Sequence, residues 1–148
     1  MDFRLAAISD YERLIELWNS VGVSRRALNP VDDSLEGIDR YLKRNPMTCF
    51  CAVEGEELFG VILAGHDGRR GIIHHLCVNP AFRMKGVATK LVWLAEGALL
   101  AEGIQKVFGL VFKDNEDGNS FWEKHGYTLR TNINYRNKSF CRDIPQGE

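Results

Sequence analysis

A basic loop with a single glycine, residues 83–88 (RMKGVA), has residue types and a spacing that could bind an anion. It follows an apolar run that ends at Val78 and predicts a strand, and it precedes apolar residues at helical spacing. The first amides of a helix have no intrahelical partner, and the helix dipole favours negative charge there. Gly86 would let the backbone approach a ligand, and Arg83 and Lys85 add positive charge. The loop therefore predicts a phosphate site; the alternative is a strand–turn–helix corner whose basic side chains are only solvated.

The composition is that of an ordinary globular domain and excludes several classes of partner. The 148 residues are 45% hydrophobic with a formal net charge of −1, so we expect one domain over residues 1–148. The basic clusters are pairs, such as Arg25-Arg26, which is too little for nucleic acid as the main ligand. No apolar run approaches the roughly 20 residues of a membrane span, and the N-terminus lacks a signal-peptide layout. We therefore expect a cytoplasmic protein that binds neither nucleic acid nor membrane.

The four cysteines predict neither a metal site nor a disulfide framework. Cys49, Cys51, Cys77 and Cys141 show no C-x-x-C spacing and no zinc-like pairing with histidine. Cys49 and Cys51 are two residues apart on an expected strand and should share one face. We interpret them as small buried hydrophobic groups, with redox chemistry as the alternative.

Apolar periodicity and capping residues place strands and helices along the whole chain. The expected strands are residues 2–8, 48–54, 57–65, 72–78, 106–112, 127–130 and 133–140. Helices are expected after a Ser9–Glu12 capping box, over 34–44, from 87 to about 103, and over 116–125 with Asn115 as N-cap. Residues 22–33 are expected to form a loop. The resulting order is β-α-α-β-β-β-α-β-α-β-β, with the central strands in an antiparallel meander.

The loop and this element order together resemble one enzyme family. Residues 83–88 have the form R/Q-x-x-G-x-G/A directly after a strand ending Leu76-Cys77-Val78, which resembles the acyl-CoA pyrophosphate loop of the GNAT superfamily of N-acetyltransferases. The order matches the GNAT fold, an α/β fold with a mixed sheet, along nearly the whole chain. The G-x-G-x-x-G spacing of dinucleotide-binding loops is missing.

The resemblance implies acetyl-CoA as co-substrate, without a metal. The pyrophosphate would accept hydrogen bonds from the loop amides, and the pantetheine arm would lie along the preceding strand as an added strand does. A backbone N–H near Leu76 would polarise the thioester carbonyl. The implied contacts are Leu76, Cys77, Val78, Arg83, Met84, Lys85, Gly86, Val87, Ala88, Thr89 and Asn115.

A second stretch, residues 115–127 (NEDGNSFWEKHGY), resembles the GNAT pattern N-x-x-A-x-x-hydrophobic-Y-E-K-x-G-F/Y. Gly118 stands where alanine is usual, and Trp122 stands where the family usually has a tyrosine. That tyrosine lies near the CoA sulfur and is often assigned as the general acid. An indole N–H donates a hydrogen bond but releases no proton in this pH range. Trp122 could therefore stabilise the leaving thiolate without protonating it, or it could be a packing residue.

Acetyl transfer to an amine also needs a base, because an alkylamine with a pKa of about 10 is protonated at neutral pH. His74 is the candidate, since in related arylalkylamine N-acetyltransferases a histidine at the matching position belongs to a proton-removing relay. It lies two residues before Leu76, so both side chains should share a face, with His75 on the opposite face. The alternative is a histidine that is hydrogen-bonded in the core or at the surface. Many relatives place a glutamate two residues earlier, where this chain has Ile72.

The function implied by the resemblance is N-acetylation of a primary amine of a small molecule, by direct transfer in a ternary complex. One alternative is a protein or peptide N-terminal acetyltransferase, and another is a non-catalytic acyl-CoA-binding module. Arg25 and Arg26, in the expected loop beside the acceptor, could bind a substrate carboxylate or be a solvated pair. Family members often pair through their sheets, so a homodimer is a further expectation.

Overall fold

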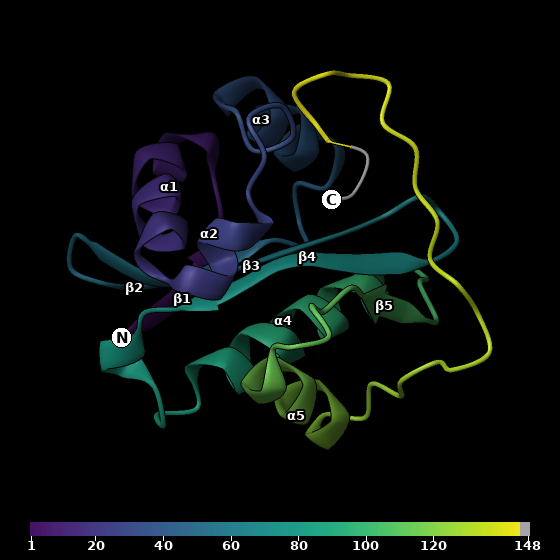
Figure 1. Cartoon of the computed structure of the whole chain (residues 1–148). Coiled ribbons are helices and arrows are strands. Elements are labelled where there is room, and N and C mark those ends of the chain that lie inside the picture. The colour runs from purple at the N-terminus through teal and green to yellow at the C-terminus, as the bar shows by residue number, and fades with distance from the viewer. Residues whose placement is uncertain (146–148) are drawn as a thin grey trace.

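The computed structural model describes residues 1–145 as one five-stranded sheet with helices on both faces (Figure 1). The strands are β1 (Asp2–Leu5), β2 (Phe50–Glu54), β3 (Glu57–His66), β4 (Gly71–Val78) and β5 (Val107–Gly109). Their order in the sheet follows the chain; β1 to β4 are antiparallel neighbours, and β5 runs parallel to β4. The α/β class and the central antiparallel meander predicted from the sequence are confirmed.

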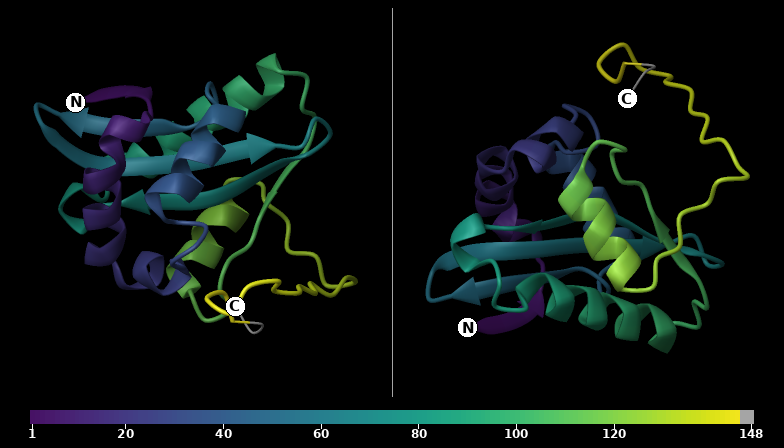
Figure 2. Two further views of the ribbon diagram at one scale, coloured as in Figure 1. Left: turned by 90° about the horizontal axis from the view of Figure 1, so that it is seen from above. Right: turned by 60° about the horizontal axis from the view of Figure 1, so that its bottom comes forward.

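The helices divide into two groups that cover opposite faces of the sheet, as the turned views show (Figure 2). One face carries α1 (Tyr11–Ser20), α2 (Gly22–Ala27) and α3 (Leu35–Arg44); the other carries α4 (Val87–Ala101) and α5 (Glu116–Lys124). Short 3-10 turns at Ile8–Asp10 and Pro80–Phe82 precede α1 and the loop before α4. None of the helices in residues 1–145 has the length and apolar character that a membrane crossing requires.

The period-two alternation of the strands sends buried side chains to two separate cores. On the α4 side, a helical stripe packs against the sheet; its fully or almost fully buried members are Val87, Leu91, Val92, Ala95 and Leu99. Burying a leucine side chain contributes about 1.5–3 kcal/mol, so this stripe fixes α4 on the sheet. On the α1 and α3 side, Cys49, Cys51 and Cys77 are buried free thiols, and burial raises the pKa of the Cys49 thiol to about 12. The shared face of Cys49 and Cys51 and their packing role are confirmed.

Local capping signals predicted two helix starts correctly and misplaced one. Ser34 accepts from the amide of Gly37 at 3.0 Å, and Asn115 accepts from that of Gly118 at 3.0 Å. The Ser9–Glu12 box is wrong: Asp10, the last residue of the 3-10 turn, reaches back and accepts from the Ala7 amide, and its carboxylate also accepts from two arginines, Arg4 and Arg13. The chain enters α1 through a 3-10 turn, so the acidic side chain that reaches back to a free amide is Asp10 and not Glu12.

One irregularity in the sheet affects the candidate site. Leu63 of β3 faces His75 of β4, but the next residue, Ala64, faces Ile73, so His74 has no partner across the ladder. Such a bulge adds a residue to one strand, bends it and breaks its alternation.

Three expectations about local structure are wrong. Residues 22–27 of the expected loop form α2, and the expected strand 106–112 is reduced to β5. Residues 127–130 and 133–140 form no strands. A strand needs a partner ladder, and the pairing of β5 with β4 already ends at Gly109. The apolar side chains of this last stretch, among them Leu129, Ile133 and Tyr135, stay exposed.

Candidate active site

The candidate site lies where β4 and β5 separate. Their parallel pairing runs from Gly71 opposite Val107 to Ile73 opposite Gly109 and then stops, one residue before the bulge at His74. Beyond that point the second half of β4 continues without a neighbour on this side. The end of β5 at Gly109 thus leaves backbone groups of β4 without a ladder partner on this side.

The backbone of β4 shows which groups face this opening. The amide of Asn79 donates to the carbonyl of Phe59 at 2.8 Å and so extends the β3–β4 ladder. Alternate residues of a strand turn their N–H and C=O groups to opposite sides, so Cys77 faces β3, whereas Leu76 and Val78 face away from it. The side chains of Leu76 and Val78 pack on the α4 side, and Cys77 is buried on the α1 side.

The loop after β4 has the backbone geometry of an anion-binding turn. Met84 and Gly86 both have left-handed backbone, with φ of 65° and 75°. For a non-glycine residue such a conformation costs about 1–2 kcal/mol, and the Met84 side chain gains nothing in return, because it is fully exposed. Left-handed residues in a loop turn successive amides toward one side, which forms a concave site for an anion.

Helix α4 begins at the end of this loop and supplies further donors. Within residues 1–145 the amides of Val87, Ala88 and Thr89 have no hydrogen-bond acceptor, as expected for the first turn of a helix. A Cβ added at Gly86 would meet no protein atom within 4 Å, so the space in front of the loop is open. The exposed Lys85 lies beside this space, with its ammonium 5.4 Å from the Phe82 ring centre.

Helix α5 borders the opening from the other side. The Asn115 side chain is half-buried, and its Oδ1 accepts the capping hydrogen bond of α5. Its side-chain nitrogen Nδ2 can therefore donate to a ligand. Trp122 is half-buried against the α4 core, with its ring 4.7 Å from that of Tyr127. The Thr89 hydroxyl and His125 Nε2, 2.9 Å apart, tie α4 to α5. In this conformation Trp122 packs, and the sequence signal for its role at the cofactor stays a prediction.

The bulge overturns the expected placement of one of the two histidines. His74 was expected to share a face with Leu76, but its ring meets the Tyr41 ring of α3 edge-on at 5.4 Å, on the other face. His75 was expected to point away from the face of Leu76, and this is confirmed, because its ring lies 4.5 Å from that of Trp18 in α1. Both histidines therefore lie on the α1–α3 face, because the extra residue shifts the alternation by one.

The two histidines differ in their surroundings. His74 is exposed, yet partial burial lowers its pKa, and repulsion from His75 lowers it further. His75 is largely buried, with its side chain 11% exposed, and its Nε2 lies 2.8 Å from Oδ1 of Asp33, which precedes α3. Asp33 is 42 residues away in sequence, and the sequence places it only at the end of the expected loop 22–33, with no signal for a site residue.

Arg26 neither stays free for a substrate nor is simply solvated. Its guanidinium donates to Asp114 at 2.7 Å and lies 3.8 Å from the centre of the Phe112 ring. The pair joins α2 to the segment between β5 and α5. Arg25 stays exposed on α2.

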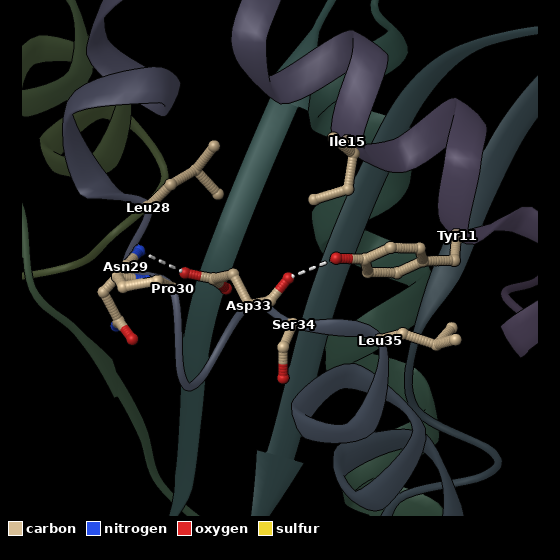
Figure 3. A pocket seen from close by; sticks show the side chains of 8 residues that line it. All are labelled: Tyr11, Ile15, Leu28, Asn29, Pro30, Asp33, Ser34 and Leu35. Carbon is tan, nitrogen blue, oxygen red and sulfur yellow. Dashed lines mark hydrogen bonds between the residues drawn. The ribbon is translucent and has the colours of Figure 1, made fainter. Parts of the chain in front are cut away.

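A surface pocket of about 450 Å³ lies between α1 and the loop before α3, with Asp33 in its lining (Figure 3). Its polar atoms are bonded to one another: Tyr11 donates to the Asp33 carbonyl, and the Asn29 and Ser34 side chains cap the loop and α3. This pocket therefore presents few free polar groups to a ligand. Across residues 1–145, no group of three or more His, Cys, Asp or Glu side chains gathers as metal ligands would.

Comparisons with known proteins agree with this geometry. The family described as "Acetyltransferase (GNAT) family" matches residues 11–127. The chain is 31% identical over 143 residues to the acetyltransferase SG1711 of Sodalis glossinidius, covering 97% of this chain and 98% of that protein.

Two solved structures share the fold. The PaiA N-acetyltransferase of Thermoplasma acidophilum, in complex with coenzyme A, superposes with a TM-score of 0.74 at 20% identity over 88% of this chain and 92% of that one. The aminoglycoside 6′-N-acetyltransferase AAC(6′)-IG of Acinetobacter haemolyticus gives 0.71 at 18% identity over 95% and 100%. At these identities the likeness establishes the fold alone.

Proposed function

The chain belongs to the GNAT family of acetyltransferases, and we propose that it transfers the acetyl group of acetyl-CoA directly to a primary amine of a small molecule. The choice of acetyl-CoA as the acetyl donor rests on one observation: the unpaired amides of Val87, Ala88 and Thr89 face free space beside Gly86. A diphosphate is the ligand that such a helix start and left-handed loop suit best. Arg83 and Lys85 would add charge to this contact.

The separation of β4 from β5 supports a place for the rest of the donor. In this proposal the pantetheine arm lies along Leu76, Cys77 and Val78, where an extended chain can pair with backbone groups that the sheet leaves free. The Leu76 amide then polarises the thioester carbonyl as the oxyanion develops. Asn115 reaches the arm from α5, and Trp122 stays the candidate for the sulfur. The acceptor enters from the α1–α3 face, where the bulge places both histidines.

The donor half is tested by calorimetric titration with acetyl-CoA and, in parallel, with S-acetylpantetheine, which carries the thioester but no diphosphate. We expect saturable binding of acetyl-CoA and at least a 100-fold weaker response to the shorter thioester, equivalent to about 2.7 kcal/mol. No heat from millimolar acetyl-CoA would contradict the proposal. Equal binding of both would show that the loop is not the diphosphate site.

The acceptor half is tested by CoA release with a panel of alkylamines, aminoglycosides and peptides with free N-termini. Turnover of small amines supports the proposal, whereas turnover of peptides alone would favour a peptide N-terminal acetyltransferase. Binding of acetyl-CoA without any turnover would indicate a non-catalytic module. Direct transfer in a ternary complex predicts intersecting double-reciprocal lines, and parallel lines would indicate an acetyl-enzyme instead.

The proposal also covers the cellular location and the oligomeric state of the enzyme. The buried free thiols of Cys49, Cys51 and Cys77 suit a reducing compartment, so we propose a cytoplasmic location. A homodimer is proposed from the family resemblance alone, and sedimentation equilibrium would measure it.

A further inference from the structure

His75 of β4 and Asp33 of the loop before α3 form a largely buried histidine–carboxylate pair, two residues beyond the last β4 residue that pairs with β5. The pair is separate from the loop of residues 83–88. His75 Nε2 and Asp33 Oδ1 are 2.8 Å apart, and the two side chains are only 11% and 7% exposed. The imidazole lies against Trp18, whose side chain is fully buried, with 4.5 Å between ring centres. The ring of His75 is therefore held on two sides.

Asp33 is itself fixed, which makes it a rigid partner. Its Oδ2 accepts from the Asn29 amide at 2.9 Å, and its backbone carbonyl accepts from the Tyr11 hydroxyl at 2.7 Å. Because an ionised carboxylate only accepts hydrogen bonds, it holds the proton of His75 on Nε2. Nδ1 is then the free basic nitrogen, and it has no protein partner within residues 1–145. It is the ring nitrogen nearer the backbone of β4.

The pair is an unusual choice for a purely structural contact. A buried ion pair seldom stabilises a fold more than apolar side chains of the same shape would. A second histidine–carboxylate pair of this chain, His66 with Glu102 at 2.9 Å, lies at the surface, with side chains 20% and 39% exposed. The buried pair differs from it in being oriented, shielded and adjacent to the opening.

We propose that His75, oriented by Asp33, is the base that accepts the proton of the acceptor ammonium; this inference rests on the proposed function. The N–H bond of the ammonium breaks, its proton moves to Nδ1 of His75, and the electron pair stays on nitrogen. That nitrogen forms the new C–N bond to the thioester carbonyl carbon, and the C–S bond breaks. The second proton leaves the nitrogen as the intermediate collapses and ends on the departing thiolate. The carboxylate of Asp33 stabilises the imidazolium that forms.

Other groups around the bulge define the electrostatics of this step. The loop before α3 contributes Asp32 as well as Asp33, α3 contributes Tyr41, and β4 contributes His74 and Cys77. From α1, the Trp18 ring approaches His75, and the Tyr11 hydroxyl donates to the Asp33 carbonyl. His74 has no carboxylate at hydrogen-bond distance and is exposed, so it is the weaker choice for a base on this face.

The test is the pH dependence of kcat/KM for an alkylamine acceptor, measured for the wild type and for His75→Gln, Asp33→Asn and His66→Gln. The wild type should lose rate only on the acid side, where the imidazole is protonated. His75→Gln should lower the rate at neutral pH by about 100-fold or more, and its rate should then rise about tenfold per pH unit toward the pKa of the amine. Asp33→Asn should lower the pH-independent value of kcat/KM less than His75→Gln does, and it should move the decline on the acid side to lower pH. His66→Gln is the matched control and should behave as the wild type.

The outcomes separate this inference from the proposed function. The circular dichroism spectrum at the assay temperature and the acetyl-CoA affinity should be close to wild type in all three variants, which shows that fold and donor site survive even where the melting temperature falls. An unchanged profile in His75→Gln, or loss of the acid limb in His74→Gln instead, would overturn the role of His75 while leaving the acetyltransferase intact. A wild-type chain that acetylates no amine at all would overturn the proposed function, and the base with it. For a merely structural pair, both variants would lose stability without any change in the shape of the profile.

Discussion

The two halves of the candidate site are built from different parts of the polypeptide. The donor end, residues 83–89, offers backbone amides from one continuous stretch, namely a loop and the first turn of α4. The bulge face, formed by His74, His75 and Asp33, offers side chains from β4 and from the loop before α3. Backbone groups are present whatever the side chains, so the donor end needs only a particular loop shape. The bulge face depends on which side chains the fold brings together, and it is therefore where an acceptor preference can vary.

The largest effect expected from this comparison is at Gly86. Gly86→Glu places a side chain and a negative charge in the open space before the loop amides, so acetyl-CoA affinity should fall by about 100-fold or more, measured by calorimetry. Gly55→Glu is the matched control: Gly55 also has left-handed backbone, with φ of 61°, and open space around it, but lies in the β2–β3 turn. Equal affinities of the two variants would show that the loop does not hold the diphosphate.

A smaller effect is expected where the donor end does use a side chain. Thr89→Val removes the hydroxyl that pairs with His125 at 2.9 Å but keeps the backbone amide. The free energy of unfolding should fall by about 1 kcal/mol, and the melting temperature by roughly 2–4 °C. Acetyl-CoA affinity should be retained. A tenfold loss of affinity at unchanged melting temperature would show that the hydroxyl, not the amide, contacts the donor.

On the bulge face, His74 should leave a small signature in the pH dependence of stability. Burial and then His75 lower its pKa in the folded chain, so the unfolded chain binds this proton more readily. The contribution of neutral His74 is therefore present above about pH 6.5 and is lost as the pH falls below it. His74→Gln should flatten that decline in urea unfolding followed between about pH 7.5 and 5. A slope identical to that of the wild type would contradict the shift.

The smallest effect is expected from Arg26, which joins α2 to Asp114 near the opening. Both side chains are exposed, by 50% and 70%, and exposed ion pairs contribute little because water and salt screen them. Arg26→Gln should leave the urea midpoint unchanged within error. A clear loss of stability would mean that the stacking of the guanidinium on Phe112, at 3.8 Å, holds the two segments together.

Some elements were readable from local sequence because their signals act over a few residues. Ser34 and Asn115 cap helices with donors three residues ahead, and the apolar stripe from Val87 to Leu99 follows one helix face. The expectation of strands beyond residue 127 failed, because alternation of apolar and polar residues does not by itself supply a strand to pair with. The apolar residues there lack the ladder that β5, ending at Gly109, would have had to provide.

The sequence by itself determined the GNAT class, the meander and the position of the glycine loop before α4, since each depends on the spacing and order of residues along the chain. Only the tertiary structure decided the bulge face. The extra residue at His74 is defined by its missing partner on β3, and no pattern within β4 shows it. The pairing of His75 with Asp33 joins residues 42 positions apart. Register and long-range contact are properties of two segments at once, so the bulge face became visible only when the chain was folded.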